Sequence, residues 1–529
     1  MRVFHGNIIT LENEEPQTGN GDGSDFRYLV EKDGKIAFIG DQLPRAYARI
    51  PDVVELGSGA LLPAFGDGHI HFSNWALFNS TFDVREAASI EEVLSMVSDY
   101  AASAPGEKVI FGYGHSMHSV AEKRLVTRTE LDRAVKDRPV YLVCYDGHSA
   151  VANSAAIGLM PTSVRNLNGF DMLSGQIFFE AFFKASALIS GKLPVTSLLR
   201  SIKKGIDEIT GYGIGLVHTV EGVGFPADLD IELMRIAGRG AGVNFRVYFQ
   251  TMEVGKVLKR KLPRVGGCFA TALDGCFGIK DAALLEPYSD NPESKGVLFY
   301  SDGKVTEFVK EANKNNLQVQ LHCIGDAAAV QAVDAIEAAL KEYPRLDHRH
   351  TLVHGCLIPD HLLERIAKLG IGITLQPGFL TSPLEPLHYL EEIIGDRAAE
   401  IYPFRKMVEL GINISGGSDG PVTSPDPLIG IHAACNHPDP SQSLTVYEAL
   451  RLYTRDVART SFDENDKGTL KEGKDADLVI LSEDPLQVPP ADLLRLKVEN
   501  TYLAGKEQPE GKSIARTLFD GILPRGRKI

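Results

Sequence analysis

The stretch PAFGDGHIHF, residues 63–72, ends an apolar run with two histidines one residue apart. In a β-strand, residues i and i+2 point to the same face, so the side chains of His69 and His71 converge while Ile70 points to the opposite layer. Two neutral imidazoles on one face suit a divalent metal ion such as zinc. Strand histidines can also be satisfied by local hydrogen bonds, so a metal site requires further ligands elsewhere in the chain.

This stretch contains the first of eight apolar, strand-like segments in the middle of the chain. Most of them are followed by a helix-like segment, and this alternation is typical of a βα barrel. Eight strands are what a (β/α)8 TIM-type barrel requires, so we predict an α/β fold with such a barrel over residues 59–465. The expected strands lie within residues 60–72, 213–220, 243–250, 266–275, 317–326, 350–356, 370–377 and 413–420.

Two further parts interrupt or flank the predicted barrel. About residues 73–209 separate the first two strands and are too long for a loop, so we expect an inserted subdomain over the barrel mouth. Residues 1–58 contain short strand-like runs and an Asp33-Gly34 turn, and residues 466–529 are similar in character. We expect the two ends of the chain to form one small composite β-sandwich domain.

Composition and charge narrow the class of protein. With 43% hydrophobic and 24% charged residues in 529, the chain is typical of a soluble globular protein. Its net charge of -15 argues against binding to nucleic acid or to an anionic membrane. We find no signal peptide and no apolar stretch long enough to span a bilayer. Six cysteines without a C-x-x-C pair predict a reducing, cytoplasmic setting and no disulfide scaffold.

Metal-compatible side chains stand where several of the predicted strands end. The first strand ends in His69 and His71. The fifth ends in His322, the sixth in His354 and the eighth in Asp419. Because barrel enzymes place their chemistry at the carboxyl ends of the strands, these five side chains are expected to converge at one mouth.

Five segments together resemble the amidohydrolase superfamily. More narrowly, they are similar to its branch that contains N-substituted formamide deformylase and many uncharacterised metal-dependent hydrolases. The segments are PAFGDGHIHF (63–72), LHCIGDAAA (321–329), RHTLVHG (349–355), YPFRKMVELGINISGGSDGPV (402–422) and GTLKEGKDADLVILSEDPL (468–486).

The resemblance implies a function for the residues at the strand ends. It makes His69, His71, His322, His354 and Asp419 metal ligands, with Asp419 also the general base. The implied reaction is hydrolysis of a C–N bond in a small amide, N-formyl or N-acyl compound or cyclic amide by metal-activated water. The implied cofactor is one or two divalent ions, zinc first, with iron or manganese as alternatives.

One position departs from the pattern of this branch. There the fourth strand carries a lysine, four residues before an Asp-Gly pair, whose carboxylated form can bridge two metals. Aligning that pair with Asp274 and Gly275 places Ala270 at the lysine position, and alanine cannot ligate a metal. Three outcomes stay open: a site with one ion, a bridge from another acid, for which Glu180 is the candidate, or loss of the second metal and of catalysis.

Other residues beside the strand ends are secondary candidates. His148, His218 and His115 could bind substrate, and a structural role is the alternative for each. We expect Cys268 and Cys323 to pack as small hydrophobes, and zinc–thiolate ligation is the less favoured alternative.

The leading hypothesis is therefore a metal-dependent hydrolase acting on a small-molecule substrate. A heterocycle deaminase of the same fold, with Asp326 as the nearby acid, is the second. A non-catalytic or regulatory relative is the third, and Ala270 is the residue that favours it. We expect no nucleic-acid or membrane partner, and association into a homo-oligomer stays open.

Overall fold

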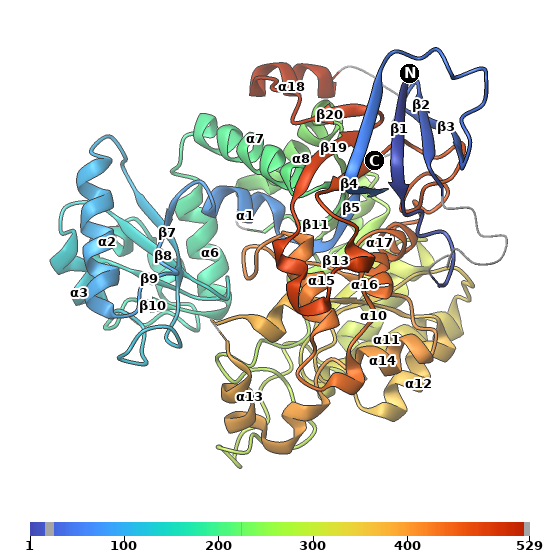
Figure 1. Ribbon diagram of the computed structural model, residues 1–529. Helices are drawn as coiled ribbons and strands as arrows, with labels where there is room; N and C mark the ends of the chain where they lie inside the picture. Colours follow the sequence, from blue (N-terminus) through green and yellow to red (C-terminus); the bar gives the residue numbers. More distant parts are fainter. Residues whose placement is uncertain (16–25, 224, 384, 523–529) are drawn as a thin grey trace.

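The computed structural model describes residues 1–15, 26–223, 225–383 and 385–522 (Figure 1). The largest of its described sheets has eight parallel strands, and each of the eight predicted strands is confirmed as a member. The strands are buried along nearly all of their length, so most of their sequences are rich in apolar residues without a strict alternation of polar and apolar positions. The strands are β5 (Phe65–Ile70), β11 (Ile214–Glu221), β12 (Asn244–Phe249), β13 (Arg264–Ala272), β14 (Gln318–Cys323), β15 (Thr351–His354), β16 (Gly372–Leu375) and β17 (Ile414–Gly416).

The sheet comes close to closing as a barrel. Its strands follow the order of the chain from β5 to β17, so these two stand at opposite edges. Just beyond them, the backbone N–H of Asp419 donates to the carbonyl of His69 (2.8 Å), and that of His71 donates to Gly420 (2.9 Å). These bonds join the two edges at the carboxyl ends of the strands, where the candidate ligands lie.

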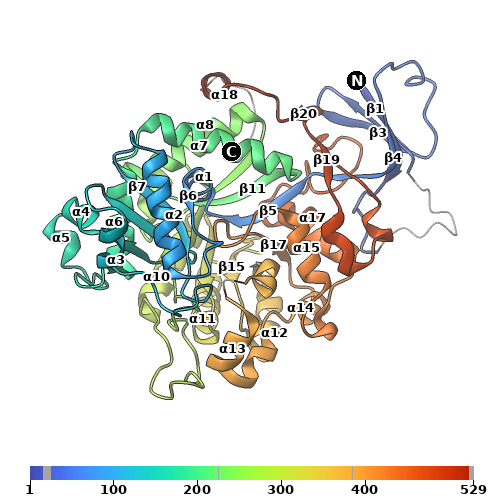
Figure 2. The ribbon, with the colours of Figure 1, turned by 60° about the vertical axis from the view of Figure 1, so that its left-hand side comes forward.

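Helices follow the barrel strands and cover the outside of the barrel (Figures 1 and 2). The α11 helix, for example, buries a face of small apolar residues that includes Ala328, Ala332 and Ile336. The barrel helices are α8 (Leu229–Ala241), α9 (Val254–Lys259), α10 (Asp302–Lys314), α11 (Asp326–Glu342), α12 (Asp360–Leu369), α13 (Leu387–Ile394), α14 (Phe404–Glu409), α15 (Pro427–Cys435), α16 (Val446–Leu452) and α17 (Arg455–Thr460).

The residues between β5 and β11 carry a separate five-stranded sheet on one side of the barrel (Figure 1). A core of its own, which includes Val93, Val97 and Leu142, lies between this sheet and the neighbouring helices. The strands are β6 (Phe82–Asp83), β7 (Ile110–His115), β8 (Val140–Cys144), β9 (Ala150–Ala152) and β10 (Gln176–Ile177). The helices are α1 (Phe72–Phe78), α2 (Ile90–Ser103), α3 (Arg128–Ala134), α4 (Ser154–Gly158), α5 (Thr162–Arg165), α6 (Phe179–Ser190) and α7 (Val195–Gly211).

The two ends of the chain form one composite seven-stranded sheet, in which the C-terminal β18 pairs antiparallel with the N-terminal β4. Among the described residues we find no second sheet facing it, so the sandwich predicted for this part is not confirmed. The strands are β1 (Arg2–Ile8), β2 (Tyr28–Lys32), β3 (Lys35–Gly40), β4 (Val53–Pro63), β18 (Leu478–Leu481), β19 (Val498–Leu503) and β20 (Lys506–Gln508).

After β20, the chain ends in helix α18 (Ile514–Ile522), which packs against α8. None of the described helices combines the length and the apolar composition that crossing a membrane would require.

Candidate metal centre

The first group of candidate ligands joins the end of β5 to the loop after β17. Oδ1 of Asp419 lies 3.2 Å from Nε2 of His69 and 3.3 Å from Nε2 of His71, and all three side chains are buried. Asp67 holds both segments, since its Oδ1 accepts from the backbone N–H of His69 (3.0 Å) and of Ser418 (3.1 Å). The two chain segments that carry these ligands are therefore tied to one carboxylate behind them.

The second group consists of His322 at the end of β14 and His354 at the end of β15. His322 donates from Nε2 to the carbonyl of Gly275 (3.1 Å), which leaves Nδ1 free. His354 has Nδ1 2.6 Å from Oε1 of Gln376, which leaves Nε2 free. A hydrogen bond from the other ring nitrogen to an oxygen is the usual way in which proteins orient a metal-binding histidine.

Cys268 of β13 lies between the two groups. Its Sγ is 3.2 Å from Nε2 of His69, 3.5 Å from Nε2 of His354 and 3.4 Å from Nδ1 of His322. Within each of two sets of buried side chains, the potential ligand atoms lie within 4.8 Å of one another, and Cys268 belongs to both. The sets are His69, His71, Cys268 and Asp419, and Cys268, His322 and His354.

An irregularity in β13 explains how Cys268 reaches this position. The strand pairs with β14 in register up to Gly267, and the pairing resumes only at Ala272, so that residues 268–271 form a bulge. Gly266 and Gly267 have φ angles of 110° and 114°, and a Cβ atom at Gly266 would lie 1.9 Å from a backbone oxygen of β14. Only glycine fits there, and consecutive glycines in a strand are the sequence signal of such a bulge.

The other residues considered for the bridge lie elsewhere. Glu180 is exposed in the first turn of α6 and belongs to neither set, so its predicted bridging role is not supported. Ala270 follows Cys268 in the bulge and presents no donor atom from its side chain. Lys280, the first lysine that follows Ala270 in the sequence, forms an ion pair with Asp290. Cys268, which the sequence analysis expected to be a packing residue, is the side chain that lies between the two groups.

The electrostatics of this cluster fit a divalent cation. Burial on its own would raise the pKa of Asp419, but the contacts with His69 and His71 lower it well below its usual value. Burial lowers the pKa of His71 and lowers that of His354 to about 4, so both rings are neutral near pH 7. The Oδ1 atom of Asp419 lies 3.2 and 3.3 Å from Nε2 of His69 and of His71 without the angles of a regular hydrogen bond. An ionised oxygen facing neutral imidazoles is a donor set for a metal.

The three secondary histidines differ in their positions. His148 reaches the site: its Nδ1 is 2.6 Å from the carbonyl of Asp146, and its Nε2 is buried without a partner among the described residues. His115 accepts the backbone N–H of Val126 (2.8 Å) and so holds a loop of the insertion. His218 is fully buried within β11, and burial lowers its pKa to about 3. Among the described residues, neither of the last two lines a pocket at the site.

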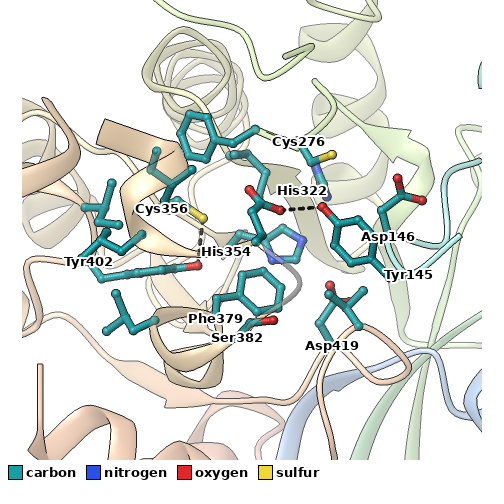
Figure 3. Close-up of a pocket in the computed structure, with 18 of the residues that line it drawn as sticks. Tyr145, Asp146, Cys276, His322, His354, Cys356, Phe379, Ser382, Tyr402 and Asp419 are labelled. Atoms are coloured by element: carbon teal, nitrogen blue, oxygen red, sulfur yellow. Dashed lines mark hydrogen bonds between the residues drawn. The ribbon is translucent and has the colours of Figure 1, made fainter. Parts of the chain in front are cut away.

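A pocket opens beside His322, His354 and Asp419, whose side chains point toward it (Figure 3). Its walls are mostly apolar and aromatic. They include Phe277, Ile324, Phe379, Leu387, Leu390, Ile401 and Tyr402, with Tyr145, Asp146, His148 and Glu385 as polar members. A second pocket between the insertion and the barrel shares Asp146, His148, Asp419 and Val422 with the first. The candidate ligands therefore lie where two cavities meet.

Comparison with known proteins agrees with this geometry. Residues 52–507 match the amidohydrolase family. This chain belongs to the amidohydrolase family. It is accordingly a hydrolase that acts on carbon–nitrogen bonds.

Three known proteins resemble the chain over nearly its whole length. YtcJ of Bacillus subtilis (strain 168) is 28% identical over 537 residues, which cover 95% of this chain and 98% of YtcJ. The N-substituted formamide deformylase of Arthrobacter pascens is 23% identical, over 94% of this chain and 97% of that enzyme. The crystal structure of an uncharacterised metal-dependent hydrolase from Pyrococcus furiosus superposes with a TM-score of 0.72 at 27% identity, over 92% of this chain and all of that one.

Proposed function

We propose that this amidohydrolase uses a divalent metal and Asp419 to hydrolyse the C–N bond of a small, uncharged amide. The substrate class is an N-formyl or N-acyl amine or a cyclic amide. The observation that supports the proposal most strongly is the buried carboxylate of Asp419, 3.2 and 3.3 Å from two histidines and open to an apolar pocket. The similarity to an N-substituted formamide deformylase supports the same class of substrate.

The side chains of the two groups are of the types that bind zinc. His69, His71 and Asp419 would hold one ion, and His322 and His354 would contribute to a second. Bound there, a divalent ion lowers the pKa of water toward neutrality and polarises the carbonyl of the substrate. Imidazole nitrogens favour zinc, with iron or manganese as alternatives.

Asp419 would move the proton during the reaction. Its carboxylate accepts a proton from the attacking water, whose oxygen forms the new bond to the carbonyl carbon. The same carboxyl group then donates that proton to the amide nitrogen as the C–N bond breaks, so that an amine and a carboxylic acid leave. The lowered pKa of Asp419 keeps the group ionised and ready to accept the proton.

His148 is placed to orient the amide. Its Nδ1–H donates to the carbonyl of Asp146, so in the neutral ring Nε2 is an acceptor, and this atom has no partner among the described residues. The side chain lines both pockets at the point where they meet. It can therefore accept the N–H of a secondary amide whose carbonyl faces the metal ligands.

The lining of the first pocket supports an uncharged substrate. Among its described lining residues there is no lysine or arginine, while Asp146 and Glu385 are both present. A substrate carboxylate would be desolvated there without a cationic partner, which is costly. Aromatic or aliphatic substituents would instead be buried against Phe277, Phe379 and Leu390.

The deaminase alternative has less support from the structure. Asp326, the acid considered for protonating a ring nitrogen, accepts the backbone N–H of Leu285 (2.8 Å) and of Ala327 (2.9 Å). Among the described residues that line the pockets, Asp326 does not occur. Asp326 is the first residue of α11, and its carboxylate stabilises the start of that helix and the loop that contains Leu285.

A substrate screen with two readouts tests the proposal. Protein of known metal content is incubated with N-formyl amines, N-acyl amines, cyclic amides and amino-substituted heterocycles, and the formation of new amino groups, on released amines or on ring-opened products, and of ammonia is followed. We expect organic amine from N-formyl or N-acyl compounds. Ammonia from heterocycles alone, or no turnover in any class with bound metal present, would contradict the proposal. Asp326→Asn serves as the control and is expected to retain turnover.

A further inference from the structure

We propose that Cys268 is the bridging ligand of the metal centre, with one thiolate shared between two ions. It would take the place of the carboxylated lysine that the family resemblance leads one to expect at position 270. This inference rests on the proposed metal-dependent function and adds the identity of the ligand that holds the second ion.

The distances around Cys268 are those of ligands on a common metal. A tetrahedral zinc ion with ligand bonds of about 2.0–2.3 Å places neighbouring ligand atoms about 3.3–3.6 Å apart. Sγ of Cys268 lies 3.2 Å from Nε2 of His69, 3.4 Å from Nδ1 of His322 and 3.5 Å from Nε2 of His354. These nitrogens belong to both groups, so the sulfur faces both ion positions.

The second group needs this sulfur to become a metal site. His322 and His354 provide two imidazoles and no negative charge, whereas protein zinc sites have at least three protein ligands. Asp274 lies near, but its Oδ1 accepts from the backbone N–H of Ile324 (3.0 Å), and its Oδ2 from Gly325 (2.8 Å). Its carboxylate approaches the Nε2 side of His322 (3.6 Å), opposite the nitrogen that faces the sulfur.

The bulge in β13 makes the replacement of the lysine understandable. Residues 268–271 leave the regular pairing with β14, so counting alternate residues back from Asp274 no longer tells which side chain faces the barrel mouth. Ala270 instead fixes the bulge from its backbone, because its carbonyl accepts from the hydroxyl of Tyr300 (2.9 Å). Cys268, two residues earlier, is the bulge residue that presents a ligand atom to the histidines, while the ring of Phe269 packs against His71.

A thiolate bridge would also change which metals the protein accepts. Metal binding would displace the thiol proton of Cys268 to solvent and leave one negative charge shared between the two ions. Thiolate is a soft ligand and favours zinc, and cadmium or cobalt as its substitutes, over manganese or magnesium. The bridge would need no carbon dioxide, unlike a carboxylated lysine.

Spectroscopy of the cobalt-substituted holoenzyme tests this proposal apart from turnover. Metal-free full-length protein is titrated with Co²⁺ while bound cobalt and the thiolate-to-cobalt charge-transfer band in the near ultraviolet are recorded. The wild-type protein is expected to bind about two equivalents and to show the band. Cys268→Ala should bind at most one equivalent and lose the band, and the buried Cys323→Ser should retain both.

Two further variants separate ligation from folding. Cys268→Ser keeps the size of the side chain, and Cys268→Asp offers a carboxylate bridge; both should fold with wild-type circular dichroism. The aspartate variant is expected to regain about two equivalents of cobalt without the thiolate band. The bridge would be overturned by a band that persists in Cys268→Ala, or by binding of a single equivalent to the wild type. Binding of no cobalt at all would instead contradict the proposed metal-dependent function.

Discussion

The two ligand groups at the barrel mouth differ in charge and in how they are held. His69, His71 and Asp419 carry a negative charge of their own, and backbone hydrogen bonds between the segments after β5 and β17 bind them together. His322 and His354 are both neutral rings, oriented individually by a carbonyl and by a glutamine side chain. The first group therefore offers three potential ligands, one of them anionic, whereas the second would depend on the sulfur between the two groups.

Replacing Asp419 tests the group that carries the charge and should have the largest effect. Asp419→Asn removes the proton acceptor and one anionic ligand, so we expect kcat to fall by about 10³-fold or more. Substrate affinity should change little, because the apolar pocket walls remain. Steady-state kinetics together with metal analysis measure the change. Turnover within a few-fold of wild type at equal metal content would refute the assigned role.

A pair of variants at positions 268 and 270 tests which position of the β13 bulge supplies the bridging ligand. Cys268→Ala should lose the second ion, and adding Ala270→Lys to it should not restore that ion even in bicarbonate buffer. The reason is that the bulge directs position 268, and not position 270, toward the histidines. Bound zinc is counted after gel filtration. Recovery of the second equivalent in the double variant would show that position 270 is the bridging one.

Removing the support of His354 should weaken the second group selectively. Gln376→Ala deletes the amide oxygen that lies 2.6 Å from Nδ1 of His354. Loss of such a partner typically costs about 10–100-fold in metal affinity, and we expect this for the more weakly bound ion alone. Competition with a chelator measures both affinities.

Two control variants test whether the effect of Gln376→Ala comes from the loss of the hydrogen bond to His354. Gln376→Glu retains an acceptor and should bind the second ion as wild type does. Gln331→Ala removes a buried glutamine that bonds Tyr300 and Asp302 on the outside of the barrel and should leave both affinities unchanged. An equal loss of both ions in Gln376→Ala would mean that the two groups do not behave separately.

Much of this site could be predicted from the sequence. Apolar runs that end in His69, His322, His354 or Asp419 are enough to place candidate ligands at the ends of strands, because parallel barrel strands all end at the same mouth. Cys268 could not be placed in this way. The alternation of side chains between the two faces of a sheet predicts where a residue points only in a regular strand. The bulge in β13 interrupts this alternation. The pair of glycines before Cys268 was the available signal.

The orienting residues were also beyond sequence reasoning. Gln376 and Gly275 are far in sequence from the histidines that they hold, and no local pattern connects them. Asp67 is closer, but its bond to Ser418 depends on how the barrel closes.

The exposure of Glu180 on α6 could not be predicted either. It depends on how the insertion folds, which the apolar pattern around Glu180 does not reveal.

The smallest predicted effect concerns a carboxyl group in the pocket, outside both ligand groups. Burial raises the pKa of Glu385 to about 7, even though the hydroxyl of Tyr145 (3.2 Å) donates to it. An unfolded glutamic acid has a pKa of about 4.3, so between these values the folded state binds more protons than the unfolded state. Stability is therefore lost as the pH rises through this window.

Glu385→Gln should remove that contribution. We expect the wild type to lose about 2 kcal/mol more than the variant between about pH 5 and pH 7.5, seen as a steeper fall in Tm. Metal content should be equal in the two proteins, since Glu385 is in neither ligand set. Parallel Tm curves would show that this carboxyl group has an ordinary pKa.

The most direct test of the account is X-ray absorption at the zinc edge of the fully loaded wild-type protein. If one thiolate of Cys268 is shared by two ions, each zinc should show about one sulfur ligand near 2.3 Å with nitrogen and oxygen ligands near 2.0–2.1 Å. The sulfur should be absent in Cys268→Ala. A shell of nitrogen and oxygen alone in the wild-type protein would show that Cys268 is not a metal ligand.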